Sequence, residues 1–221
     1  MNIPPTMRQS DSERLAGKIM ADIQARTLAP GMWLKQIDIE QRYEATRNVA
    51  RAALIRLAAQ RYIEHEPNRG YRVPAIEGTK RIQLLRVRAI LEASLVPEIV
   101  ARVTDDAIAE LRGLAADFTH GVETSGFLEL IEINRAFHSR MQMLAQNAEH
   151  MRIIQDLRRT LRAYPGMTWD SPAMMRASAE DHHAMVDALE ARDIERLMHL
   201  TISHIGKGEL GSVELAHFND T

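Results

Sequence analysis

The sequence predicts a mainly α-helical protein in which an N-terminal winged helix-turn-helix, three helices plus a β-hairpin wing, precedes an all-α antiparallel helical bundle. Aromatic residues make up 5% of the 221 residues, while leucine, alanine, methionine and arginine are plentiful, and this composition favours helices over sheets. Strand-like alternation is confined to a short stretch near residues 62–73. From Lys80 to about Gly206 the apolar residues recur with helical spacing, which indicates roughly six helices with a core of their own.

The chain is long enough to bury a core, and 45% hydrophobic and 26% charged residues are ordinary for a globular protein. The absence of cysteine excludes disulfides and thiolate metal sites. No apolar run approaches the roughly 20 residues of a membrane span and no signal peptide is recognisable, so we expect a cytoplasmic protein. The expected organisation is a disordered lead at 1–10, the winged helix-turn-helix at 11–75, a linker at 76–81, the helical bundle at 82–207 and a tail at 208–221.

The first predicted helix covers the stretch "DSERLAGKIMADIQART". Its apolar residues Leu15, Ile19 and Ile23 recur at helical spacing, and either Asp11 or Ser12 can cap its start. The following "LAPG" contains proline and glycine, which end a helix. The pattern therefore predicts an amphipathic helix followed by a tight connection.

Two further helices and a hairpin complete the first part. A short helix is expected near 37–43, and a third begins after Thr46, which can cap it. In "YIEHEPNRGYRV" two alternating segments, Tyr62–His65 and Tyr71–Val73, flank the turn "PNRG" and predict a hairpin. Three helices and a hairpin in about 65 residues are typical of a winged helix-turn-helix.

The net charge of −2 conceals an uneven distribution. Between Gln41 and Arg72 there are seven arginines and three acidic residues, a local surplus of four positive charges. The rest of the chain must then be acidic overall. Such a difference between segments suggests a module that binds a polyanion, attached to a second module with another role.

Arg47 and Arg51 carry the sharpest signal in this basic segment. They lie four residues apart at the start of the third helix, on one face, where the second helix of a helix-turn-helix meets base edges. The guanidinium fork matches the two acceptors of guanine, whereas the simpler alternative is a charged helix surface facing water. We expect a set of residues from the helices and the wing to contact the bases or phosphates of a nucleic acid: Arg42, Thr46, Arg47, Asn48, Arg51, Arg56, Asn68, Arg69 and Gly70.

These residues resemble the DNA-binding domain of the GntR family of bacterial transcription regulators. The stretch from "LAGKIM" to "YRVPAI" matches its landmarks, including both arginines and the wing "PNRGYRV". The resemblance implies that Arg47 and Arg51 contact operator bases and that Gly70 approaches the DNA backbone. The family usually has proline at the position of Val49 and glutamate at that of Ala52, and these departures bear on the operator sequence rather than on the fold.

A second constellation lies in the predicted bundle. In "FLELIEINRAFHSRMQMLAQ", projected at about 100° per residue, Asn134 and His138 fall inside the apolar stripe, while Gln142 is predicted on the polar side. His182 and His204 align with apolar positions of their helices, so three of the nine histidines point inward. Converging imidazoles suit Zn²⁺ or a similar ion, but a lone inward histidine is more often a satisfied core residue. The spacing alone leaves both alternatives open.

Residues 80–207 resemble the helical effector domain of the FadR-like branch of the same family, the FCD domain, on the landmarks "RAILE", "NRAFH", "DHHAMVDALEARD" and "MHLTISH". The resemblance implies an FCD-type effector-binding and dimerisation domain at 82–207 and a divalent metal ion, zinc first and nickel or manganese as alternatives. Its ligands would be Asn134, His138, His182 and His204, with asparagine in place of the stronger aspartate. It also implies a small carboxylate effector near Arg88, where a solvated helix arginine is the alternative, and we add Arg162 to this pocket.

Together these features predict a ligand-responsive transcription regulator, a repressor by the family's commoner behaviour, that binds a pseudo-palindromic operator as a homodimer. A metal-sensing regulator and an architectural DNA-binding protein are alternatives. A histidine-site metallohydrolase is less favoured, because no H-E-x-x-H helix and no inward general base accompany the histidines. We therefore do not expect an enzyme.

Overall fold

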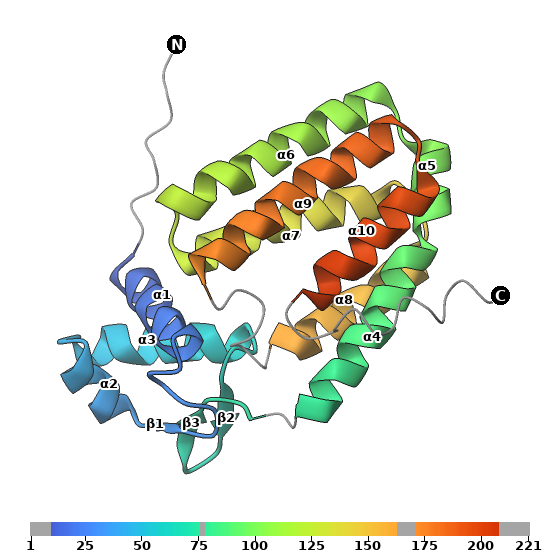
Figure 1. Ribbon diagram of the computed structural model, residues 1–221. Helices are drawn as coiled ribbons and strands as arrows, with labels where there is room; N and C mark the ends of the chain where they lie inside the picture. The colour runs from blue at the N-terminus through green and yellow to red at the C-terminus, as the bar shows by residue number, and fades with distance from the viewer. Residues whose placement is uncertain (1–9, 76–77, 163–170, 208–221) are drawn as a thin grey trace. The chain divides into compact units, whose positions relative to one another are not determined.

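The computed structural model describes residues 10–75, 78–162 and 171–207, and the chain divides into two compact units after Ala75 (Figure 1). The expected lead and tail fall almost entirely outside the described residues. Both units are dominated by helices, as the composition predicts, and within these described ranges all strands belong to the first unit. Within the described ranges no helix is long and apolar enough to cross a membrane.

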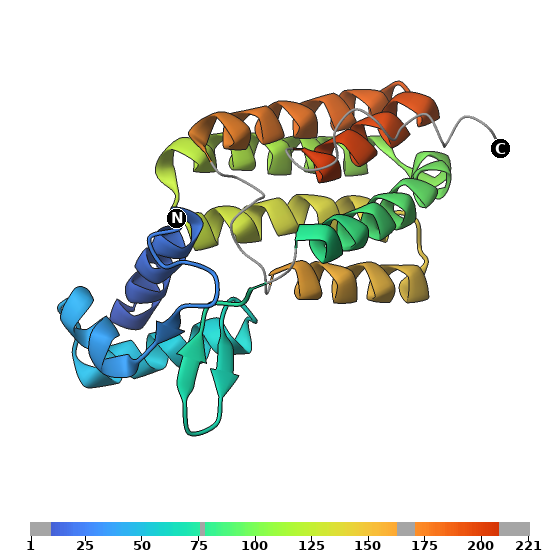
Figure 2. The ribbon, with the colours of Figure 1, turned by 60° about the horizontal axis from the view of Figure 1, so that its bottom comes forward.

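The first unit is a winged helix-turn-helix. Its strands form an antiparallel sheet in the order β1-β3-β2, and Figure 2 shows the β2–β3 hairpin projecting as the wing. The pairing of β1 with β3 was not predicted, because a two-residue strand carries no alternation to detect. The elements are α1 (Asp11–Gln24), β1 (Trp33–Leu34), α2 (Gln36–Arg42), α3 (Arg47–Ala59), β2 (Glu64–Glu66) and β3 (Gly70–Arg72).

The helix starts of this unit differ from expectation in two places. Ser10 caps α1: its hydroxyl accepts from the Glu13 N–H at 3.2 Å, while the Glu13 carboxylate accepts from the Ser10 N–H at 2.9 Å. The prediction of Asp11 or Ser12 is therefore wrong, since Ser10 forms this reciprocal pair with Glu13. Thr46 occupies the N-cap position of α3 as predicted, but its side chain makes no capping hydrogen bond.

The core of the first unit forms between α1 and α3, which pack directly on one another. Ile19 and Ile23 of α1 are buried, as are Leu54 and Leu57 of α3. Burying these aliphatic side chains leaves the opposite face of α3 exposed to solvent. The packing therefore fixes which side of α3 can meet a ligand.

The second unit contains seven described helices rather than the six expected. The extra boundary falls at Leu95, where α4 ends and α5 begins with Pro97 in its first turn. Proline is favoured at a helix start, but "EASLVPEI" has no glycine or polar cluster to announce the break. The helices are α4 (Gly78–Ser94), α5 (Val96–Arg102), α6 (Asp105–Thr124), α7 (Phe127–Met143), α8 (Ala148–Arg162), α9 (Pro172–Glu190) and α10 (Ile194–Gly206).

The bundle is built around α6, α7, α9 and α10. Helix α6 packs on α7 and α9, α10 packs on α9 and α4, and α8 packs on α4 (Figure 1). Phe137, Met185 and Leu189 are fully buried in its main core. The inner faces of α7, α9 and α10 therefore converge, and each of them also carries one inward histidine.

Candidate nucleic-acid interface and metal centre

The outer face of α3 carries exposed basic and polar side chains. Arg47, Asn48 and Arg51 are exposed, while Ala50 and Ala53 on the opposite face of α3 are buried. Among the described residues, no side chain pairs with the guanidinium of Arg47 or Arg51. Two exposed guanidiniums one turn apart at a helix start form a surface that can meet phosphates or base edges.

The other two helix arginines of the predicted interface already have partners. Arg42 donates to the Asp22 carboxylate at 3.0 and 3.2 Å, and Tyr43 donates its hydroxyl proton to the same group at 2.7 Å. Arg56 forms an ion pair with Glu13 at 3.0 Å. Both arginines thus connect helices of this unit, and a phosphate would compete with carboxylates for them.

The wing places its predicted residues in a tight turn. Asn68 and Gly70 have left-handed φ angles of 64° and 101°, a conformation that glycine adopts without a Cβ clash. Between them, Arg69 has a 67% exposed side chain and lies 3.5 Å from Glu66. The turn therefore presents one guanidinium at the tip of the hairpin.

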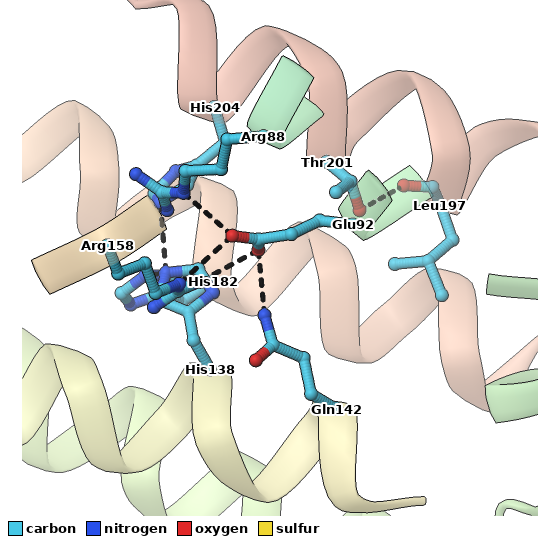
Figure 3. A network of polar contacts seen from close by, with 9 residues as sticks. All are labelled: Arg88, Glu92, His138, Gln142, Arg158, His182, Leu197, Thr201 and His204. Atoms are coloured by element: carbon cyan, nitrogen blue, oxygen red, sulfur yellow. Dashed lines mark hydrogen bonds and ion pairs between the residues drawn. The ribbon is translucent and has the colours of Figure 1, made fainter. Parts of the chain in front are cut away.

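The second unit brings its three inward histidines together (Figure 3). His138 on α7 lies between the others: its Nε2 atom is 3.1 Å from Nε2 of His204 on α10 and 3.3 Å from Nε2 of His182 on α9. One ring nitrogen from each residue lies within 4.8 Å of the other two. The sequence projection predicted the inward direction of each ring, and the packing of α7, α9 and α10 makes the rings meet.

The protonation of these rings favours metal binding. Burial lowers the pKa of His138 and His182 well below the ordinary value of 6.5, and nearby positive charge lowers both further. Burial also lowers the pKa of His204, although Asp181 acts in the opposite direction. All three imidazoles are therefore neutral near pH 7, which is the form that coordinates a metal ion.

A carboxylate fixes the orientation of one ring. Nδ1 of His204 lies 2.9 Å from the Asp181 carboxylate, which also accepts from Nζ of Lys207 at 2.6 Å. An anionic Asp181 makes Nδ1 of His204 the protonated nitrogen and leaves its Nε2 lone pair directed at the cluster. Asp181 stays anionic because hydrogen bonds from His204 and Lys207 lower its pKa and outweigh the raising effect of burial.

Asn134 and the histidines themselves leave polar atoms without partners. The Asn134 Oδ1 atom is buried with no hydrogen-bond partner among the described residues, and the same holds for Nδ1 of His138 and of His182. Asn134 precedes His138 by one helical turn and so shares its face of α7. A buried acceptor without a donor is costly, and a cation would satisfy it. The donor set of one amide oxygen and three imidazoles therefore fits a divalent ion such as zinc.

Beside the histidines lies a buried ion cluster around Glu92 (Figure 3). Arg158 donates to both Glu92 carboxylate oxygens at 3.0 and 2.7 Å, and Arg88 donates its Nε–H to one of them at 2.7 Å. Gln142 donates to the other oxygen at 2.8 Å. Burial alone would raise the pKa of Glu92, but Arg158 and Arg88 outweigh it and lower the pKa to about 2. Two cations thus surround one anion, an excess of one positive charge.

Three members of this cluster were missed or misplaced from the sequence. Gln142 was predicted to face water, yet it is buried, because it follows His138 by one turn and shares that face. Glu92 follows Arg88 by the same spacing, a signal that could have been used. Arg158 lies in a helix with many charged residues, and no pattern distinguishes it from the others. The side chain of Arg162, which we assigned to the effector pocket from the sequence, lies outside the described residues.

Two known families match the chain. The family described as "Bacterial regulatory proteins, gntR family" matches residues 11–73. The family described as "FCD domain" matches residues 83–207, more than half of the chain. The matches follow the winged helix-turn-helix and the helical bundle, and both correspond to the resemblances noted in the sequence.

Related proteins agree with these matches. The Nta operon transcriptional regulator of Aminobacter aminovorans is 26% identical over 178 residues, which are 80% of this chain and 83% of the relative. The HTH-type transcriptional repressor RspR of Escherichia coli K12 is 23% identical over 180 residues, 80% and 79% of the two chains. The solved structure of Escherichia coli McbR/YncC has a TM-score of 0.57 at 23% identity, covering 89% of this chain and 93% of that one. The families and relatives are transcription regulators, which confirms that the chain is not an enzyme.

Proposed function

Because the chain belongs to the GntR family of bacterial transcription regulators and carries its FCD domain, we propose that it is a ligand-responsive repressor that binds a pseudo-palindromic operator as a homodimer. The observation that carries the DNA-binding part is the pair of exposed guanidiniums of Arg47 and Arg51 on α3, which have no side-chain partner in the described part of the chain. A two-fold dimer presents two such helices and imposes its symmetry on the operator. RspR, a relative named as a transcriptional repressor, supports repression rather than activation.

The metal part of the proposal rests on the histidine cluster. Asn134, His138, His182 and His204 would hold a divalent ion, zinc first, with nickel or manganese as alternatives. A bound ion supplies an electrophilic centre that attracts a carboxylate oxygen. Asp181 orients His204 toward the cluster, and the low pKa of each imidazole removes proton competition near neutral pH.

The effector in this proposal is a small carboxylate. Arg88 and Arg158 carry two positive charges, against the single negative charge of Glu92. Arg158 donates to that carboxylate through Nε and one terminal nitrogen. Arg88 uses its Nε on Glu92, and its side chain remains 15% exposed. Its terminal nitrogens are therefore the donors that a carboxylate can reach, with Arg162 as a further candidate from the sequence.

Metal analysis tests the centre. Protein purified without chelator or histidine tag should contain close to one divalent ion per chain, and His138→Ala should lose it together with thermal stability. His199→Ala is the matched control, because His199 is an exposed histidine on α10, one of the helices that line the centre. Equal metal content in both variants would refute the assignment.

A metal-sensing regulator is the second candidate, favoured by the same cluster. The two functions separate when binding to a duplex selected from a random-sequence library is titrated with zinc at fixed carboxylate, and then with carboxylate at fixed zinc. A response to the carboxylate at saturating zinc supports the effector proposal, whereas a response to zinc alone supports metal sensing.

A further inference from the structure

The three-stranded sheet brings an aromatic ring beside the wing. Trp33 of β1 pairs with Arg72 of β3, and Arg72 pairs with Glu64 of β2 on its other side. Residues opposite one another in neighbouring strands share a face of the sheet. The side chains of Trp33, Arg72 and Glu64 therefore form a row across the base of the hairpin.

The Trp33 ring contacts two guanidiniums. The guanidinium carbon of Arg69 lies 4.7 Å from a ring centroid of Trp33, and that of Arg72 lies 5.7 Å away. Both distances fall within the roughly 6 Å over which a cation is attracted to the face of an aromatic ring, for which tryptophan is the strongest partner. Trp33 thus connects the tip of the wing to its base.

The two arginines differ in how firmly carboxylates hold them. Arg72 lies 3.1 Å from Glu64 and 3.7 Å from Glu66, and its side chain is 37% exposed. Arg69 has Glu66 alone as an ion-pair partner among the described residues, at 3.5 Å, and is 67% exposed. Arg72 is therefore a fixed part of the sheet, while Arg69 is the guanidinium that an external phosphate can take over.

We propose that Trp33 is a positioning residue for DNA binding: its indole face holds Arg69 in the conformation from which Arg69 contacts the phosphate backbone, and Glu66 is the counter-ion that the phosphate replaces. This inference rests on the proposed binding of DNA. Arginine has many rotamers, and a guanidinium already stacked loses less freedom when it binds a phosphate. The stack also survives the exchange of Glu66 for a phosphate, because the ring face and the donor edge of arginine are used separately.

The test measures affinity for a labelled duplex that the wild-type protein selects from a random-sequence library. Trp33→Leu, which keeps an apolar side chain without a π face, should weaken binding about two- to fivefold, and Trp33→Phe should retain most of the affinity. Arg69→Ala should weaken binding and reduce the slope of log affinity against log salt concentration by about one. In the Arg69→Ala background, Trp33→Leu should have no further effect, because the ring acts through Arg69.

The counter-ion is tested with a matched pair of variants. Glu66→Gln and Glu64→Gln each remove one negative charge from β2, but Glu66 alone of the two pairs with Arg69. Glu66→Gln should therefore tighten binding more than Glu64→Gln. Equal effects of this pair would overturn the counter-ion role, and equal loss from Trp33→Leu with and without Arg69 would overturn the positioning role. Melting temperatures of all variants identify any loss that comes from unfolding.

The outcomes separate this inference from the proposed function. A wild-type protein that selects no duplex would overturn both. A protein that selects a duplex, and loses that preference in Arg47→Ala, supports DNA binding by α3 whatever Trp33 does. The Trp33 series and its double variant then decide the positioning role alone.

Discussion

The two units use arginine in opposite ways. On α3 of the winged helix-turn-helix, Arg47 and Arg51 are exposed and have no described partner. In the helical unit, Arg88 and Arg158 are largely buried and share the carboxylate of Glu92. An exposed guanidinium keeps its hydration at little cost and can exchange water for a phosphate. A buried guanidinium must have its counter-ion inside the protein, because an unpaired charge there costs several kcal/mol.

This difference separates a binding surface from an internal charge cluster. Removing an exposed arginine should change what the protein binds and leave its stability intact. Removing a member of the buried cluster should change stability first. Substitutions of single side chains test this distinction.

The largest effect is expected at Glu92. Glu92→Gln keeps the shape of the side chain but leaves two buried guanidiniums without a counter-charge. The free energy of unfolding, measured by urea titration, should therefore fall by about 3–5 kcal/mol. Glu149→Gln is the control, because Glu149 is an exposed glutamate of the same unit. A loss below about 1 kcal/mol would mean that the charges around Glu92 are far better solvated than its burial indicates.

Acid should weaken the helical unit through the histidines once metal is removed by a chelator. Since their folded pKa values lie below 6.5, the unfolded chain binds more protons as the pH falls below 6.5. Stability is therefore complete above about pH 6.5 and declines below it, which melting temperatures between about pH 7.5 and about pH 5.5 will reveal. His138→Phe should lose part of this dependence, and an unchanged slope in that variant would show that the cluster does not titrate.

Arg47→Ala should alter recognition alone. Loss of a bidentate contact to guanine removes about 1–3 kcal/mol of discrimination between bases, which competition between selected and scrambled duplexes measures. The melting temperature should not change, since the exposed side chain of Arg47 has no hydrogen bond or ion pair with another described side chain. Arg14→Ala, which removes the same charge from α1, is the control, and an equal loss of preference in both variants would assign the effect to charge in general.

The smallest effect is expected at an exposed ion pair of the helical unit. Arg112 on α6 donates to the carboxylates of Asp187 and Glu190 on α9. Like the pair between Arg158 and Glu92, this interaction joins two helices, but the side chain of Arg112 is 44% exposed. Arg112→Gln should cost less than about 1 kcal/mol, whereas Arg158→Gln should cost several times more. If denaturant titrations show similar losses of unfolding free energy in the two variants, burial does not explain the difference between exposed and buried arginines.

Much of the architecture follows from local patterns. The helical spacing of Leu15, Ile19 and Ile23 predicts α1, and the turn "PNRG" predicts the wing hairpin. The exposed face of α3 follows from the same periodicity, because the apolar positions decide which side is buried. Such features involve residues that are close together in the sequence, so their spacing along the chain is enough to predict them.

The departures have physical causes that a linear pattern lacks. Whether Ser10, Asp11 or Ser12 caps α1 depends on which backbone N–H groups the side chains reach. The strand Trp33–Leu34 exists because it pairs with β3, which lies tens of residues later in the chain. The break at Leu95 has no side-chain cap that would mark it in the sequence. Gln142 is the exception, because its spacing of one turn from His138 already places it on the inward face of α7. Only its partner Glu92, which comes from another helix, is absent from that pattern.

The two-part organisation, the basic face of α3 and the inward direction of the three clustered histidines depend on the spacing of neighbouring residues, so they can be predicted from the sequence alone. The meeting of His138, His182 and His204 depends instead on how the helices pack. The same holds for Arg158 joining Arg88 at Glu92, and strand packing places Trp33 beside Arg69. Each of these contacts joins segments separated by tens of residues. Their distances are set by how helices and strands pack, and side-chain periodicity within one element contains no information about that packing.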